Sequence, residues 1–292
     1  MEGRMKPHVL LGTCSWKFPS WHPLVYSAPD GINYLAEYAA RYKTVEIDQW
    51  FWSLFGETTV SLPRKETVAE YLEAVGSDFA FTIKVPNSIT LTHFYRSIKE
   101  VGGRPNPYFL SRELFTDFLE CIAPMRRQTR ALMFQFEYLN KQKMSGLSEF
   151  TRRMSDFLAG LPSDWTYAVE CRNPNYLKPP YFDMLASHGV GHVFLQGYYM
   201  PPVTRIYQLA RERLCGPRIM RLLGPDRSGI EKETGKKWDT IVWPRDEEIS
   251  QIAQVARDQL DRGQDVIVNV NNHYEGSAPL TIERFRTALK QL

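Results

Sequence analysis

Charged and amide side chains recur at the ends of short apolar stretches in this sequence. Lys84 closes the stretch FTIK, and Glu170 and Arg172 lie in AVECR. Within each stretch these polar residues alternate with apolar ones, as in a β-strand whose two faces meet different surroundings. The polar positions of this pattern are Glu46 and Asp48, Lys84, Gln135 and Glu137, Glu170 and Arg172, Arg221, and Asn269 and Asn271.

Two carboxylates and a lysine in this set could perform proton transfer. Glu46, Glu170 and Lys84 are the candidate catalytic residues, because clustered ionisable groups acquire the shifted pKa values that acid–base chemistry needs. Lys84 could instead anchor an anion, pair with Glu46, or form a Schiff base if its pKa were lowered. The structural alternative is a salt-bridge plug, in which Arg172 or Arg221 neutralises the carboxylates.

Other side chains are suited to hold a substrate. Arginines bind phosphate and carboxylate groups through two parallel hydrogen bonds, and amides match sugar hydroxyls, phosphates or base edges. Aromatic rings offer flat surfaces for sugars or bases, although they could equally form an apolar cap. The candidate substrate-binding residues are Trp16, Gln135, Arg172, Arg221, Asn271, Asn272 and Tyr274. For the last three, a turn and helix cap without a ligand is the alternative.

Composition narrows the class of protein. The chain has 292 residues, of which 36 are Lys or Arg and 33 are Asp or Glu, so its net charge is only +3. This balance disfavours nucleic acid as a partner. The four cysteines show no CxxC spacing and no histidine-rich cluster accompanies them, so we expect neither a metal nor a cofactor. No apolar run is long enough for a membrane span or a secretory signal, and we expect a cytoplasmic protein.

Strands and helices alternate along the whole chain. We expect strands at 8–15, 44–49, 79–85, 130–136, 166–171, 192–196, 217–222 and 265–271. We expect helices at 31–42, 64–75, 110–123, 147–160, 180–188, 203–213, 246–262 and 280–291. Eight such pairs predict an α/β fold, a single (β/α)8 TIM-type barrel domain over residues 1–292. The long connections, at 86–109 and 223–245, both follow strands, which places them on the C-terminal face where barrels carry active sites.

Several motifs resemble those of the YecE-like family, a group of TIM-barrel proteins of unknown function. The similar stretches are GTCSW at 12–16, TVEIDQWFW at 44–52, FAFTIKVPNSITLTH at 79–93, MFQF at 133–136, AVECRNPNY at 168–176 and NVNNHYEGSAPLTIERF at 269–285. Two departures remove candidate proton carriers, since Leu223 replaces the His of the family's RLHG and Trp52 replaces a Tyr. The resemblance implies a barrel and brings no established chemistry.

These observations together predict a polar pocket on the C-terminal face that binds a small anionic or hydroxyl-rich molecule. We favour an enzyme, a hydrolase, lyase or isomerase that uses acid–base chemistry. The alternative is a non-catalytic binding protein for a metabolite or a nucleic-acid end. Lys84, Arg172 and Arg221 would supply the positive charge for an anion, whereas Arg227, on the long connection at 223–245, would contribute less.

Overall fold

Eight parallel strands form the framework of the protein. The computed structural model describes residues 7–56, 59–98 and 101–292. The strands are β1 Val9–Thr13, β2 Thr44–Ile47, β3 Ala80–Lys84, β4 Thr129–Phe136, β5 Tyr167–Cys171, β6 Gly191–Gly197, β7 Arg218–Gly224 and β8 Val266–Val270. Their order in the sheet is β1-β8-β7-β6-β5-β4-β3-β2, so from β2 to β8 each strand lies beside the next one in sequence, and β1 pairs with β8. This is the architecture of a (β/α)8 TIM-type barrel, as the alternation of elements predicted.

Helices follow the strands along the chain. They are α1 Tyr34–Arg41, α2 Lys65–Glu73, α3 Asn87–Thr90, α4 Arg112–Ile122, α5 Leu147–Leu158, α6 Pro179–Ser187, α7 Val203–Ala210, α8 Arg227–Thr234, α9 Asp246–Asp261 and α10 Ala278–Lys290. Short 3-10 turns are η1 Pro19–Trp21, η2 Gln49–Phe51, η3 Ala123–Gln128, η4 Pro174–Tyr176 and η5 Asn272–Tyr274. No helix in the described ranges has both the length and the apolar character needed to cross a bilayer.

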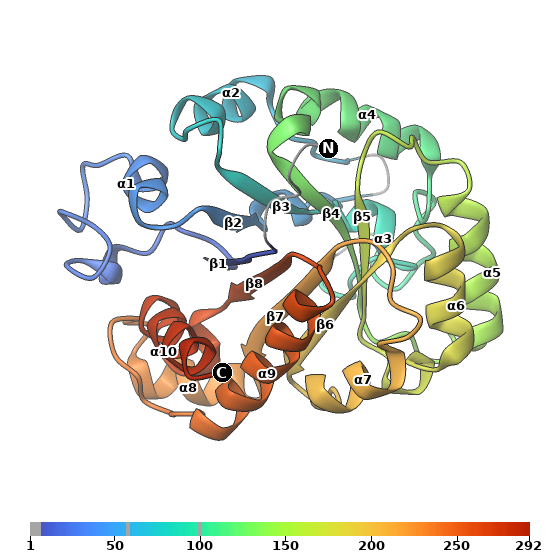
Figure 1. Cartoon of the computed structure of the whole chain (residues 1–292). Coiled ribbons are helices and arrows are strands. Elements are labelled where there is room, and N and C mark those ends of the chain that lie inside the picture. The colour runs from blue at the N-terminus through green and yellow to red at the C-terminus, as the bar shows by residue number, and fades with distance from the viewer. Residues whose placement is uncertain (1–6, 57–58, 99–100) are drawn as a thin grey trace, which may run out of the picture. The chain divides into compact units, whose positions relative to one another are not determined.

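Contacts divide the chain into two compact units. The first unit comprises Met1–Glu46, Val193–Arg211 and Pro217–Leu292, and the second comprises Ile47–His192 and Glu212–Gly216. Within the first unit, α9 and α10 lie side by side (Figure 1). Within the second unit, α5 and α6 are neighbours (Figure 1).

In the second unit, an aromatic cluster determines which strand face meets the helices. Phe134 on β4 packs against Phe115 of α4 and Phe157 of α5, with ring centroids 5.2 and 5.4 Å apart. Successive strand residues point to opposite faces. Gln135, next to Phe134, therefore lies on the face away from these helices, together with its register partner Glu170 on β5. The period-two pattern of the sequence predicted this placement correctly.

In the first unit, the same rule places Arg221 and Asn269 side by side. They are register partners on β7 and β8, and Asn269 is in turn the register partner of Gly12 on β1. A Cβ at Gly12 would lie 2.2 Å from the carbonyl oxygen of Thr44, so any side chain at this position would push the two backbones apart. Glycine at this position therefore allows β1 and β2 to approach closely.

Two short helices lie inside connections where the sequence predicted none. In the connection after β7, α8 begins where the Asp226 side chain accepts a hydrogen bond from Gly229 N, and it ends before Gly235, whose φ is +56°. Its only buried residue is Ile230, so its apolar periodicity was too weak to detect. The connection after β3 contains the four-residue helix α3, and residues 99–100 of that connection lie outside the described part of the chain.

Candidate functional site

Three polar side chains at the ends of β4 and β5 form what we call the Glu170 cluster: Gln135, Glu170 and Arg172. Arg172 Nε donates to Glu170 Oε1 at 2.7 Å, and Arg172 Nη2 donates to Gln135 Oε1 at 3.0 Å. The side chain of Glu170 is 2% exposed, whereas that of Arg172 is 20% exposed. The cluster thus joins a buried carboxylate to a cation that solvent can reach.

Lys84 ends β3 in the same unit, where it is 8% exposed. Its ammonium lies 3.8 Å from the centre of the Phe51 ring, which is a cation–π distance. Phe51 in turn contacts the ring of Trp52, at 5.3 Å between centroids. An aromatic face next to the ammonium stabilises its charge without consuming its hydrogen-bond donors.

Tyr95 connects this strand end with the Glu170 cluster. Burial, followed by the charge of Glu137, raises the pKa of Tyr95, while a hydrogen bond with Asn87 and the charge of Arg172 lower it. Glu137 is paired with Lys143 at 2.5 Å. Tyr95 is therefore close enough to both Glu137 and Arg172 to respond to their charges.

Trp52 is the most exposed aromatic side chain near this position. It is 58% exposed, and its ring centroid lies 6.0 Å from that of Tyr95. Trp16, by contrast, is 4% exposed in the first unit, and its carbonyl accepts a hydrogen bond from the Tyr26 hydroxyl. Trp52 is thus open to solvent, while Trp16, a candidate substrate-binding residue of the sequence, is buried.

Glu46 and Arg221 form a second cluster, in the first unit. Arg221 Nε and Nη2 donate to the two Glu46 oxygens, each at 2.7 Å, and Asn269 Nδ2 approaches Glu46 Oε2 at 3.3 Å. The side chain of Arg221 is 4% exposed and that of Glu46 is 0% exposed. This bidentate, fully buried pair has the geometry of the salt-bridge plug, and the predicted catalytic role of Glu46 and anion-binding role of Arg221 stay predictions.

The NNHYEG segment after β8 makes an internal network. Asn272 Oδ1 accepts hydrogen bonds from Trp21 Nε1 and from Ala278 N at the start of α10, at 3.1 and 2.9 Å. Asn272 and Tyr274 are both buried, and burial raises the pKa of Tyr274 far above its usual value. These contacts fit the cap and packing role that the sequence left open as the alternative, and the substrate-binding roles of Asn272 and Tyr274 stay predictions.

His273 links this segment to α8. Its Nδ1 lies against Asn271 Oδ1, and its Nε2 lies 2.9 Å from Glu231 Oε1. Hydrogen bonds from Arg227 and then from His273 hold the pKa of Glu231 at about 2. Burial lowers the pKa of His273, against the opposite effect of Glu231. Both Arg227 and His273 thus reach the Glu231 carboxylate.

Sequence reasoning did not find Lys143 or Glu231 as partners of residues near the strand ends. Lys143 lies six residues beyond Glu137 with no periodic signal, and Glu231 lies in a helix that was not predicted. All four cysteines are free thiols. In the described ranges, no three His, Cys, Asp or Glu side chains gather in a way that could hold a metal ion.

Comparisons with known proteins agree on one family. The family model described as protein of unknown function DUF72 matches residues 10–292. The UPF0759 protein YecE of Escherichia coli K12 is 26% identical over 170 residues, 58% of this chain and 50% of the relative. The chain therefore spans about half the length of the curated relatives it matches.

Two solved structures show the fold. A DUF72 family protein from Thermotoga maritima MSB8 is 18% identical, with a TM-score of 0.66 over 97% of this chain and 99% of that one. A D-tagatose 3-epimerase-like protein is 10% identical, with a TM-score of 0.55 over 97% of each chain. At these identities the likeness concerns the barrel architecture alone.

Proposed function

The chain belongs to the DUF72 family of proteins of unknown function, as its motifs predicted, and we propose that it is an enzyme acting on a small anionic or hydroxyl-rich molecule. Its acid–base chemistry would take place at the carboxyl ends of β3, β4 and β5. The analogy with other TIM-type barrels supports this position, because their active sites lie at this end of the strands.

The contrast between the two buried ion pairs carries this proposal. Glu46 and Arg221 are both inaccessible, at 0% and 4% exposure, as expected of a pair that only fills the interior. Glu170 is equally buried, but its partner Arg172 is 20% exposed. Arginine at such a position can bind a phosphate or carboxylate group from solvent while it holds the glutamate in place.

Each residue of the site has a distinct role in the proposal. Glu170 transfers the proton, because a carboxylate on a rigid strand is held within reach of a bound substrate. Arg172 binds the anionic or hydroxyl group, and Gln135 orients the guanidinium through its 3.0 Å hydrogen bond. Lys84 supplies a second positive charge at the neighbouring strand end.

Proton exchange tests this function directly. The protein is incubated in D2O with fructose 6-phosphate, ribulose 5-phosphate and other ketose and aldose phosphates, and proton NMR follows deuterium uptake and new products. Glu170→Gln should lower the rate by about 10²- to 10⁴-fold, the usual contribution of a general acid or base. Arg152→Ala is the control, because Arg152 forms an exposed ion pair with Asp156 in the same unit.

Three outcomes separate the possibilities. Turnover that depends on Glu170 and not on Arg152 supports the enzyme. Saturable binding by calorimetry without any product supports the alternative of a non-catalytic metabolite-binding protein. Absence of both at millimolar substrate contradicts the proposed substrate class and leaves Glu170 and Arg172 as a structural pair.

A further inference from the structure

A pocket in the second unit has a lining that does not include Gln135, Glu170 or Arg172. Its volume is about 420 Å³, within the range of roughly 300–1,000 Å³ typical of small-molecule sites. Thr92, Asn106 and Phe109 of the connection after β3 line one side, and Lys141, Lys143 and Arg153 line another. Two chain segments therefore enclose a space of the right size for a ligand.

The charge of this pocket favours an anion. Three cations, Lys141, Lys143 and Arg153, line it together with one carboxylate, that of Glu149. Glu149 accepts hydrogen bonds from Ser145 N and Oγ, which lower the pKa of its carboxyl below the usual value. The turn that precedes α5 thus stabilises the negative charge of Glu149. The N-terminal end of α5 adds positive potential to the pocket.

The three cations differ in the ion pairs that they form. Lys143 is paired with Glu137, and Arg153 Nη2 is paired with Glu149 at 2.8 Å. A guanidinium has five N–H donors, so Arg153 can bind a second oxyanion while it keeps Glu149. Lys141 is exposed and makes no ion pair with another residue in the described part of the chain. Lys141 and Arg153 are therefore the side chains best placed to bind an anion.

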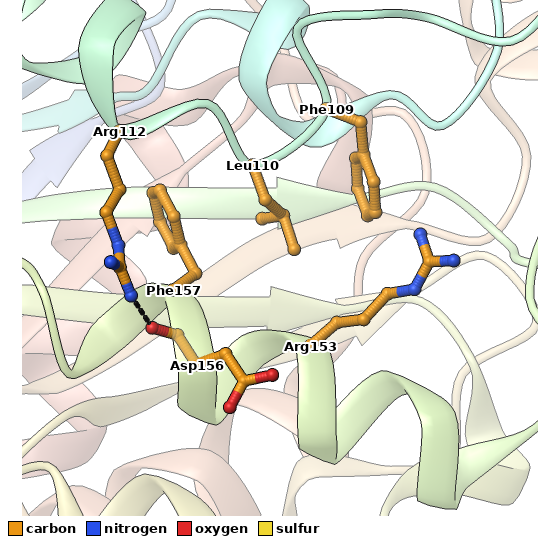
Figure 2. Close-up of a pocket in the computed structure, with 6 residues that line it drawn as sticks. All are labelled: Phe109, Leu110, Arg112, Arg153, Asp156 and Phe157. Carbon is orange, nitrogen blue, oxygen red and sulfur yellow. Dashed lines mark hydrogen bonds between the residues drawn. The ribbon is translucent and has the colours of Figure 1, made fainter.

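An apolar wall adjoins these cations. The Arg153 guanidinium lies 6.0 Å from the centre of the Phe109 ring. Figure 2 shows Phe109, Leu110 and Phe157 lining a neighbouring groove, with Arg153 at one side and Arg112 at the other. The pocket and the groove share Phe109 and Arg153. An occupant would thus meet positive charge and an aromatic face at the same place.

We propose that this pocket binds a small organic oxyanion that carries an apolar ring or chain next to its charged group. Lys141 and Arg153 bind the oxyanion, and Phe109 packs against the apolar part. The inference is independent of the function proposed for the Glu170 cluster, because Gln135, Glu170, Arg172 and Lys84 do not line this pocket.

Calorimetric titration with phenyl phosphate and with inorganic phosphate tests this site. Wild type should bind phenyl phosphate about tenfold more tightly than inorganic phosphate. Phe109→Leu, which keeps an apolar side chain but removes the ring, should weaken that preference while inorganic phosphate binds as before. Lys141→Ala should weaken both ligands about two- to fivefold, whereas Lys178→Ala, at another exposed lysine of the same unit, should change neither.

Several results would overturn the assignment. No saturable binding of phenyl phosphate at millimolar concentration would do so, as would an unchanged preference in Phe109→Leu or equal losses in Lys141→Ala and Lys178→Ala. Arg172→Gln should leave phenyl phosphate binding intact. If Arg172→Gln abolishes binding instead, the anion occupies the Glu170 cluster and this pocket inference fails, while the function proposed for the cluster gains support.

Discussion

Breaking the Glu46–Arg221 pair should destabilise the protein more than breaking any exposed ion pair would. Arg221→Met removes two 2.7 Å hydrogen bonds and leaves the Glu46 carboxylate buried, with the 3.3 Å contact from Asn269 still in place. Removing one partner of a buried pair costs about 3–5 kcal/mol, because the remaining charge has lost its compensation. We therefore expect the free energy of unfolding of Arg221→Met to fall by about 3–5 kcal/mol.

A double-mutant cycle separates the pair from the cavity that either substitution creates. Replacing both residues, as Glu46→Leu with Arg221→Met, removes the unpaired charge and should be much less costly than Arg221→Met alone. Urea denaturation followed by tryptophan fluorescence measures all the variants. Arg227→Met is the control, since Arg227 is 64% exposed in its pair with Glu231 and should cost no more than about 1 kcal/mol.

The reasoning fails if Arg221→Met costs no more than Arg227→Met, or if the double variant is as unstable as the sum of the two single ones. An Arg221→Met protein of wild-type stability that has lost phosphate binding would instead favour the anion-binding role predicted from the sequence. The two roles therefore give opposite results in the same pair of measurements.

Three further predictions concern backbone, pH and a buried amide. Gly224→Ala should unfold at lower urea than Gly31→Ala, because both have positive φ but only at Gly224 would a Cβ meet a carbonyl oxygen, that of His273, at 2.2 Å. Burial lowers the pKa of His273 below 6.5, so the unfolded chain binds a proton at this residue more readily than the folded chain does. The free energy of unfolding should therefore fall as the pH drops below 6.5. His273→Asn should make it less dependent on pH in that range, as measured by urea denaturation at a series of pH values. Asn87→Ala should lower the urea midpoint by the equivalent of about 1–3 kcal/mol, since Asn87 Oδ1 accepts from both Ser53 N and Ser53 Oγ, and Asn87→Asp, which keeps an acceptor, should lower it less.

Local pattern was sufficient for the framework of this protein. The alternation of apolar and polar residues placed Gln135 and Glu170 on the strand face opposite the helices, because neighbouring strand residues always point to opposite faces. The positions of all eight strands followed from the same pattern and from the helices between them. The alternation of polar and apolar residues along a strand indicates to which face of the sheet each side chain points.

The choice of partner was decided only by the tertiary structure. Glu46 and Arg221 are 175 residues apart, and the sequence offered either Arg172 or Arg221 as the arginine that would neutralise a given carboxylate. Arg172 pairs with Glu170, two positions earlier on the same strand face, and remains partly exposed. The exposure and pairing of a side chain depend on which atoms the folded chain brings within a few ångströms of it. The local alternation of polar and apolar residues carries no information about such long-range contacts. The difference between an interior ion pair and a candidate site therefore became visible only in the folded chain.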